Sequence, residues 1–246
     1  MDFTSFGGPT PPPPTAEAWT CSCGKTGNTL NFCQDCGKAK PAAGAPTPVP
    51  VPAPAPPTAG ISLDLNKGAV LDLTKRNPGL KAVMVGAGWD MAVAGADVDL
   101  DISAFMLNSA GKITSGGDVI FYNNMQAPGI KLSGDNRTGS GQGDDETIDV
   151  DLSQIPPQYG KIAFCVTIHE AAVRRQTFGM VSNAYIRLCD AANGNKEVCR
   201  FSLRDDYSTS TAVIFAELKR NGGEWDFVTV GDGKQGDLNT LAAYYS

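Results

Sequence analysis

The sequence predicts a mainly β protein, an antiparallel β-sandwich that follows a small cysteine-rich element and a proline-rich linker. Three observations indicate this class. Short runs alternate apolar and polar residues, which is the two-residue period of a half-buried strand. Gly, Asn and Asp turns separate most of these runs. The 41% of hydrophobic residues is sufficient for a core, and no apolar run is long enough to cross a membrane.

The chain divides into four parts by composition. Residues 1–18 are rich in Pro, Gly and Thr, have little capacity to pack, and are expected to be a disordered lead. Residues 19–40 hold four of the seven cysteines. Residues 41–60 alternate Pro with Ala and Val, which favours an extended, semi-rigid tether. Residues 61–246 carry the strand pattern and form the predicted sandwich domain.

The alternating pattern locates the individual strands of that domain. They are expected at residues 61–65, 69–73, 80–89, 98–107, 118–122, 146–152, 161–168, 184–190, 197–203, 212–218 and 224–230. Helix is limited to brief pieces near residues 153–158, 170–175 and 237–244. Short strands with turns at this spacing are typical of two antiparallel sheets packed face to face.

Four cysteines, Cys21, Cys23, Cys33 and Cys36, form two close pairs in the sequence W-T-C-S-C-G-K-T-G-N-T-L-N-F-C-Q-D-C-G. Two such knuckles can place four thiolates around one tetrahedral Zn²⁺ ion, which predicts a zinc-ribbon-like element. Two disulfides or unpaired thiols are the alternatives, and the first pair has C-x-C spacing where C-x-x-C is usual. An element this small cannot bury enough surface to fold alone, so zinc would supply its folding energy. A fully cysteine-ligated ion has no open position, so the expected role is structural or adaptor-like.

Acidic residues are concentrated between Asp90 and Asp151, where eleven Asp and Glu accompany three Lys and Arg. This stretch has a balance of −8 against −6 for the whole chain, so the remaining residues sum to +2. Like charges this close repel one another unless something neutralises them. Oxygen ligands on glycine-rich loops are selected by hard cations, Ca²⁺ above all. The stretch therefore predicts calcium binding.

The D-V-D-L-D run at residues 97–101 has the alternation of a strand with one acidic side. The side chains of Asp97, Asp99 and Asp101 would then line a site while the apolar side faces the core. An EF-hand loop is excluded, because its sixth position is Ile102 where Gly is required and its twelfth is Asn108 where Glu is required. Other loops must complete the coordination, and a solvated acidic loop is the alternative. The further contributors in these loops are Asp118, Asn123, Asn124, Asp135, Asn136, Asp144, Asp145 and Glu146.

Several motifs occur together in one order along the chain. They are G-A-G-W-D at 86–90, D-V-D-L-D-I-S at 97–103, G-G-D-V-I-F-Y-N-N at 116–124, G-D-N-R-T-G-S-G-Q-G-D-D-E at 134–146, V-T-I-H-E-A at 166–171, F-G-M-V-S-N-A-Y-I-R at 178–187 and W-D-F-V-T-V-G-D-G at 225–233. With these motifs, residues 61–246 resemble the TerD family of tellurium-resistance and stress proteins. The cysteine-rich start and the proline tether lie outside the common domain of that family.

The resemblance implies a β-sandwich of TerD type that binds Ca²⁺ through acidic loops in bacteria exposed to tellurite and other chemical stress. We expect more than one calcium ion. The leading ligands that the resemblance implies are Asp99, Asp101, Asp118, Asp135, Asp144, Asp145 and Glu146, with Asn123, Asn124 and Asn136 next.

Catalysis is not predicted. His169 is the only histidine, and beside Glu170 it could act as a general base, but a lone His at a strand end is more often a hydrogen-bonded structural residue. Cys165, Cys189 and Cys199 lie in strand-like runs and are expected to be buried as small apolar side chains. A metal-dependent hydrolase that uses the acidic loops is the alternative.

The expected role is a binding or scaffold module whose zinc ribbon recruits a protein partner. Other tellurium-resistance proteins are candidate partners. An adaptor whose main activity lies in the zinc ribbon is a further alternative. The mildly acidic balance argues against nucleic acid as a partner of the large domain. No signal sequence or membrane span is visible, so a cytoplasmic location is expected.

Overall fold

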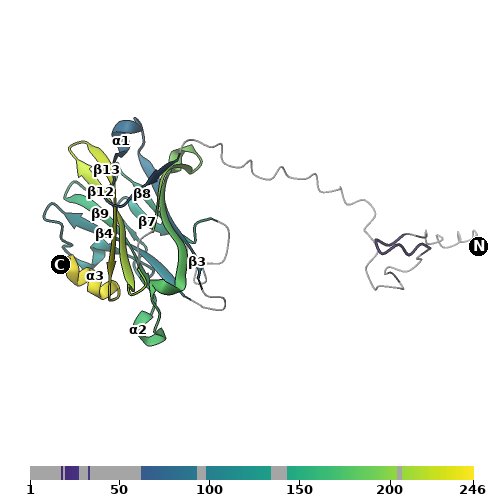
Figure 1. Ribbon diagram of the computed structural model, residues 1–246. Helices are drawn as coiled ribbons and strands as arrows, with labels where there is room; N and C mark the ends of the chain where they lie inside the picture. Colours follow the sequence, from purple (N-terminus) through teal and green to yellow (C-terminus); the bar gives the residue numbers. More distant parts are fainter. Residues whose placement is uncertain are drawn as a thin grey trace, which may run out of the picture. The chain divides into compact units, whose positions relative to one another are not determined.

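The computed structural model describes residues 18, 20–27, 33, 62–92, 98–133, 143–203 and 207–246. The chain divides into two units, Met1–Pro54 and Ala55–Ser246, and each is described by itself. Among the described residues of the second unit, two sheets pack face to face (Figure 1).

The seven-stranded sheet has the order β1-β11-β10-β3-β8-β7-β6 in the described residues. Its strands are β1 (Leu63–Leu65), β3 (Ala82–Met91), β6 (Gln126–Ala127), β7 (Ile130–Ser133), β8 (Glu146–Asp151), β10 (Val181–Asp190) and β11 (Lys196–Ser202). Neighbouring strands are antiparallel except β1 and β11, which are parallel with Asp64 opposite Arg200.

The six-stranded sheet has the order β2-β13-β12-β9-β4-β5 in the same part of the chain, and its neighbouring strands are antiparallel. Its strands are β2 (Val70–Asp72), β4 (Leu100–Asn108), β5 (Val119–Ile120), β9 (Tyr159–Ile168), β12 (Ala212–Asn221) and β13 (Glu224–Lys234). The helical pieces are α1 (Leu73–Arg76), α2 (Ala171–Arg174), α3 (Leu238–Tyr244), and the short 3-10 turns η1 (Gly116–Asp118), η2 (Phe178–Met180) and η3 (Ala191–Asn193).

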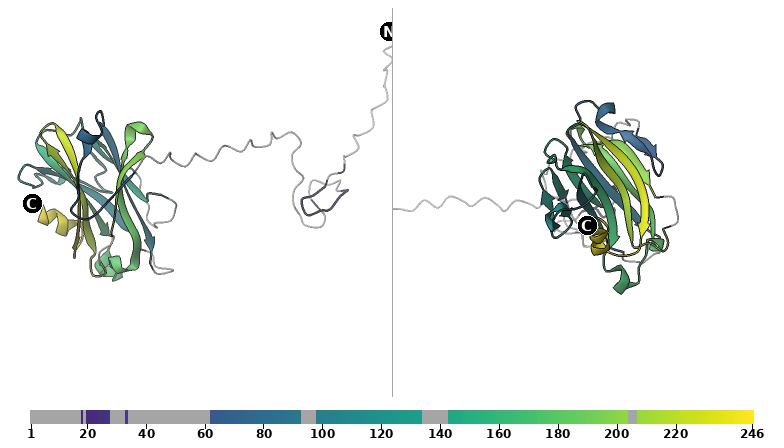
Figure 2. Two further views of the ribbon diagram at one scale, coloured as in Figure 1. Left: turned by 45° about the horizontal axis from the view of Figure 1, so that its top comes forward. Right: turned by 90° about the vertical axis from the view of Figure 1, so that its left-hand side faces the viewer.

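The core lies between the sheets, and alternation along each strand supplies it. On β4, Leu100 and Ile102 are buried in this core, whereas Asp101 lies on the opposite, outer face. A second apolar cluster covers part of that outer face, where Leu241 of α3 and Tyr245 pack against Phe105. Figure 2 shows α3 against the outside of the sandwich.

The predicted fold class is confirmed, and each predicted strand has an observed counterpart in the described residues. The helix predicted at 170–175 shortens to α2, and the one at 237–244 is α3. The helix predicted at 153–158 is wrong: Pro156 and Pro157 lack the amide donors a helix needs, and the segment forms turns, one closed by the Gln154 amide on the Asp151 carbonyl. The strands β6 and β7 were not predicted, because each offers too few alternating residues.

The cysteines of the sandwich behave as predicted. Cys165, Cys189 and Cys199 are each fully buried and unbridged. Burial raises the pKa of Cys189 to about 11 and of Cys199 to about 12, because desolvation disfavours the thiolate. Within the described residues, no helix is long and apolar enough to cross a membrane.

Candidate functional site

Three consecutive acids, Asp144, Asp145 and Glu146, lie at the start of β8, and each has different neighbours. Glu146 points inward with Ile148 and is 4% exposed. Its Oε2 atom accepts a 2.6 Å hydrogen bond from the amide of Ile102 on β4. Because β8 and β4 belong to different sheets, this carboxylate joins the two layers of the sandwich.

Asp145 is held against β3. Its amide donates to the Ala87 carbonyl at 2.8 Å, and its Oδ2 atom accepts from the Trp89 amide at 2.9 Å. The residue therefore continues the β3–β8 pairing beyond the last regular pair, which joins Ala87 and Glu146.

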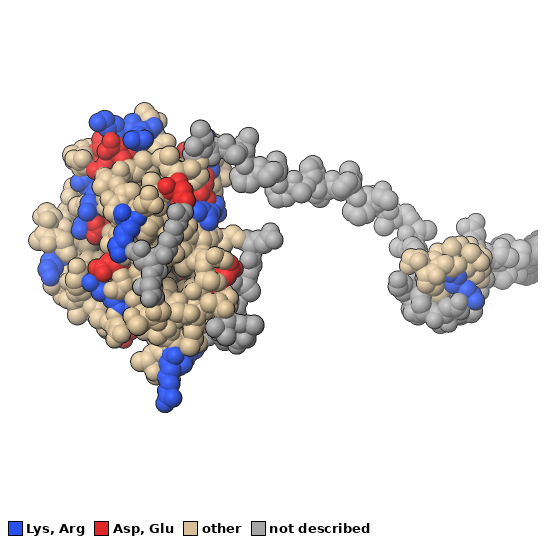
Figure 3. Space-filling view, viewed as in Figure 1, with Lys and Arg blue, Asp and Glu red and all other residues tan. Residues whose placement is uncertain are grey.

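Asp144 is part of a salt-bridge network on the seven-stranded sheet. The Arg187 guanidinium donates three hydrogen bonds of 2.7 to 3.0 Å to its carboxylate, whose side chain is 5% exposed. The Tyr185 hydroxyl donates a further bond at 3.1 Å. Arg187 and Arg200 also bind Glu197, at 3.1 and 2.9 Å. On one face of the sandwich, acidic and basic side chains are interspersed (Figure 3).

This salt-bridge network shifts the pKa values of Glu197 and Arg187. Burial raises the pKa of Glu197, but hydrogen bonds from Arg200, Ser62 and Arg187 outweigh this and lower it to about 2. The hydrogen bonds with Asp144 raise the pKa of Arg187 despite its burial. Both Asp144 and Glu197 therefore already have guanidinium counter-ions.

Asp118 closes the turn that precedes β5. Its Oδ2 atom accepts from the Thr114 amide at 2.6 Å and from the Ser115 amide at 3.0 Å, and Oδ1 accepts from the Tyr159 hydroxyl at 2.7 Å. Burial raises the pKa of Asp118, but these hydrogen bonds outweigh it and lower the pKa overall. The Asp118 carboxylate therefore already accepts hydrogen bonds from its own turn and from Tyr159.

The other sequence-predicted ligands are also spread out. Asn124 donates from Nδ2 to the Val119 carbonyl at 2.7 Å, and Asn123 lines a groove described below. Asp99 is 5% exposed, and its carbonyl accepts from the His169 amide. Asp135 and Asn136 lie outside the described residues.

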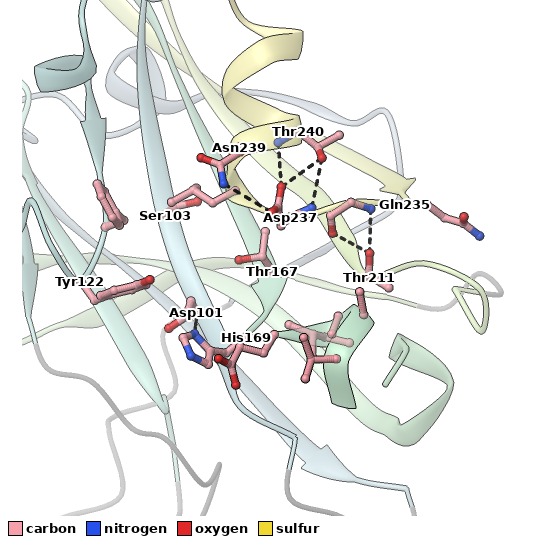
Figure 4. Close-up of a pocket in the computed structure, with 18 of the residues that line it drawn as sticks. Asp101, Ser103, Tyr122, Thr167, His169, Thr211, Gln235, Asp237, Asn239 and Thr240 are labelled. Atoms are coloured by element: carbon pink, nitrogen blue, oxygen red, sulfur yellow. Dashed lines mark hydrogen bonds and ion pairs between the residues drawn. The ribbon is translucent and has the colours of Figure 1, made fainter. Parts of the chain in front are cut away.

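A groove of about 840 Å³ opens on the outer face of the six-stranded sheet (Figure 4). Asp101 and Ser103 of β4, Thr167 of β9 and Asp237 at the start of α3 are among its lining residues. His169 also lines it, with Nδ1 3.3 Å from Asp101 Oδ2. The prediction of a hydrogen-bonded histidine is confirmed, and the structure adds that its ring borders a cavity.

Most of this groove could not be predicted from the sequence. Thr167 and Asp237 are seventy positions apart and belong to no shared motif. The V-T-I-H-E run that contains Thr167 and His169 was the available signal, since it alternates toward a strand end and carries the lone histidine.

The cysteine-rich element brings three of its four predicted ligands together. The sulfurs of Cys21, Cys23 and Cys33 lie within 4.8 Å of one another, and Cys23 Sγ is 3.6 Å from Cys33 Sγ. A tight turn holds the first pair, with the Gly24 amide donating to the Cys21 carbonyl. Cys36 lies outside the described residues. In the part of the chain that the structure describes, no three acidic or histidine side chains gather as closely.

Comparison with known proteins places these features in context. Residues 61–245 match the model of the TerD domain. The chain is 47% identical over 189 residues to general stress protein 16U of Bacillus subtilis (strain 168), covering 75% of this chain and 97% of that protein. It is 47% identical over 188 residues to tellurium resistance protein TerD of Serratia marcescens, covering 75% and 97%. The crystal structure of a homologue of telluride resistance protein (TerD) from Streptomyces coelicolor A3(2) superposes with a TM-score of 0.52 at 26% identity, covering 67% and 96%.

Proposed function

Because this chain belongs to the TerD family, we propose that it is a cytoplasmic, calcium-binding stress-response protein. It acts as a binding or scaffold module and not as an enzyme. The observation that carries the calcium proposal is the buried Glu146 carboxylate, which is 4% exposed at the start of β8. A carboxylate in such a position is costly unless charge and hydrogen bonds compensate it.

The donor set fits a hard cation. Glu146, Asp145 and Asp99 supply carboxylate oxygens at strand starts, and Asp99 is also buried, at 5% exposure. Oxygen donors of this kind are what Ca²⁺ takes, commonly six to eight of them. We propose that each of these three residues contributes to calcium binding; among the described residues no three acidic ligand atoms lie within 4.8 Å of one another, so the three do not form one preformed site. Calcium bound there would neutralise their charge and stabilise the folded state relative to the unfolded one.

Asp118 and Asp144 have a different role in this proposal. Asp118 is already occupied by the donors of Thr114, Ser115 and Tyr159, and Asp144 by Arg187. We therefore propose that these two acids fix the backbone around the metal loops and do not contact the ion.

Calorimetric titration of Ca²⁺ into the calcium-free full chain tests this assignment. Glu146→Gln keeps the size and one oxygen of the side chain but removes its charge, so it should abolish or strongly weaken binding. Glu197→Gln is the matched control, because Glu197 belongs to the arginine network on the seven-stranded sheet. Equal affinity in wild type and Glu146→Gln would contradict the assignment.

We also propose that Cys21, Cys23 and Cys33 bind Zn²⁺, with Cys36 as the fourth ligand. Tetrahedral zinc with bonds of about 2.3 Å separates its sulfurs by about 3.8 Å. The 3.6 Å separation of Cys23 and Cys33 is close to that value. It is far from the bond length of a disulfide, about 2.05 Å.

Metal analysis of the purified full chain tests the zinc proposal. One zinc per chain is expected in wild type and much less in Cys33→Ser, with Cys199→Ser as a control at a buried cysteine of the sandwich. A disulfide would instead leave wild type free of zinc and of titratable thiols in this element. We propose that the zinc element binds the protein partner and the sandwich binds calcium. Deletion of residues 1–60 should therefore remove partner binding and leave calcium affinity unchanged. The other tellurium-resistance proteins of the same cell are the partners to test.

A further inference from the structure

The groove on the six-stranded sheet is negatively charged. Asp101, Glu170 and Asp237 line it, and no Lys or Arg is among the described residues of its lining. Glu170 is at the rim, with a half-exposed side chain that pairs with Arg174 at 3.3 Å. Asp237 is also exposed, whereas the Asp101 side chain is 15% exposed, and Figure 4 shows these two acids on either side of Thr167.

Asp237 is held in place by the helix that it caps. Its Oδ1 atom accepts from the Thr240 amide at 2.9 Å, which satisfies a donor at the start of α3. That hydrogen bond lowers the pKa of Asp237 against the opposing effect of burial, so the carboxylate is ionised at neutral pH.

A buried hydroxyl lies between the two acids. Thr167 is 4% exposed and lines the groove, and its cross-strand partner on β4 is Asp101. Figure 4 shows its side chain between Asp101 and Asp237. Among the residues that the structure describes, the Thr167 hydroxyl has no hydrogen-bond partner. Because Thr167 lines the groove, its hydroxyl can form a hydrogen bond with a ligand that enters it.

An aromatic wall completes the groove. Tyr122 is 41% exposed, and its ring centroid is 6.0 Å from that of His169. An exposed aromatic face beside carboxylates attracts organic cations through its quadrupole and also packs well against methylene groups. The volume of about 840 Å³ lies within the range of small-molecule sites.

The groove offers acceptor oxygens from Asp101, Thr167 and Asp237, which suit an ammonium ligand. A primary ammonium group has three donors, and each can take one acceptor. One such group would find acceptors in Asp101 and the Thr167 hydroxyl, and a second would find one in Asp237.

We propose that this groove binds primary alkylammonium groups, with a linear aliphatic diamine as the ligand class that its two ends fit. Asp101 and Asp237 each bind one ammonium group, Thr167 accepts a further hydrogen bond, and the methylene chain lies along Tyr122. This site does not rest on the calcium proposal, because the groove lies on the outer face of the six-stranded sheet and Glu146 is buried between the two sheets.

Calorimetric titration of putrescine into the calcium-free full chain tests the proposal. Butylamine and butanediol are the comparison ligands, because they remove one or both ammonium groups from the same chain length. Binding should be saturable for putrescine, weaker for butylamine and absent for butanediol. Asp237→Asn and Asp101→Asn should each weaken putrescine binding by at least about 5-fold, because a hydrogen bond to a charged group is lost.

The chain offers a matched control for Asp237→Asn. Asn also caps helices well, so the substitution removes the charge and preserves the cap. Asp190→Asn makes the same change at the N-cap of η3, outside the groove, and should leave binding unchanged. Absence of saturable amine binding, or an equal loss in Asp190→Asn, would overturn the proposal. Tighter binding of N-acetyl-lysine amide than of putrescine would assign the alkylammonium group to a lysine side chain of a protein and not to a free diamine.

Discussion

The Glu146 carboxylate on β8 accepts a hydrogen bond from the Ile102 amide on β4, at 2.6 Å, and so joins the two sheets of the sandwich. Both residues are buried, at 4% and 1% exposure. The pairing of β4 with β5 reaches only Ala104 and Phe105, so the edge of β4 near Ile102 has no strand beside it on that side in the described residues. The Glu146 carboxylate of the opposite sheet therefore supplies the hydrogen-bond acceptor that a neighbouring strand would otherwise supply.

Glu146→Ala is expected to destabilise the calcium-free protein by about 1–3 kcal/mol, because the buried Ile102 amide loses its acceptor. Glu146→Gln retains an oxygen at the same position and should cost less. Urea unfolding of the calcium-free chain measures both losses. Equal losses in the two variants would mean that the bond to Ile102 contributes little.

Arg187→Met is expected to cost about 3 kcal/mol, because it leaves the Asp144 carboxylate buried without its counter-ion. Lys219→Met is the control, since the Lys219 side chain is 43% exposed where it pairs with Glu217. Exposed pairs contribute about 0–1 kcal/mol. Similar losses for both variants in urea unfolding would contradict the distinction between the two pairs.

Gly86→Ala should disrupt the ion pair between Asp144 and Arg187. A Cβ at residue 86 would overlap the Asp144 carboxylate, and that carboxylate cannot move away without breaking its bonds to Arg187. We expect a loss of about 1–3 kcal/mol in urea unfolding. Gly160→Ala on β9 is the matched control, because its Cβ would meet nothing closer than 3.7 Å. A tolerated Gly86→Ala with an intact ion pair would show that the strand can shift at this point.

Glu197 should make the protein acid-sensitive in a defined window. Its carboxyl has a pKa of about 2 when folded, against an ordinary value of 4.5. A lowered folded pKa gives stability that is fully present above the unfolded value and is lost as the pH falls toward the folded value. For this partly exposed group we expect about 2 kcal/mol.

The comparison of wild type with Glu197→Gln isolates this contribution from that of other acids. The difference in unfolding free energy should be largest above about pH 5 and should shrink toward pH 2. It is measured by urea unfolding at a series of pH values. A difference that stays constant across this range would contradict the shifted pKa of Glu197.

The sandwich could be predicted from sequence because its strands carry their own pattern. Leu100 and Ile102 alternate with Asp101, and the buried faces of β4 and β8 follow directly from that period. The parallel pairing of β1 with β11 could not be predicted, since it joins segments more than one hundred residues apart. The α1 helix was missed because Leu73 continues the alternation of β2 while already belonging to the helix.

The site was harder to predict than the fold. Composition identified the acids but could not say that Asp144 has an arginine partner, that Asp118 closes its own turn or that Glu146 points inward. The partner of each acid depends on the direction in which its side chain points. These acids lie at strand ends, where the regular alternation of side chains stops and no longer predicts that direction. The groove depends on contacts between Asp101, Thr167 and the start of α3, which only the assembled sheet brings together.

Thermal unfolding of the calcium-free full chain, repeated with Ca²⁺ and with Mg²⁺, tests the central claim most directly. At a calcium concentration 100-fold above the dissociation constant, one site should add about 2.7 kcal/mol of stability. We expect a Ca²⁺-selective rise in Tm for wild type and for Glu197→Gln, and little or none for Glu146→Gln. No rise with Ca²⁺ in wild type, or an equal rise in Glu146→Gln, would contradict calcium binding at the start of β8.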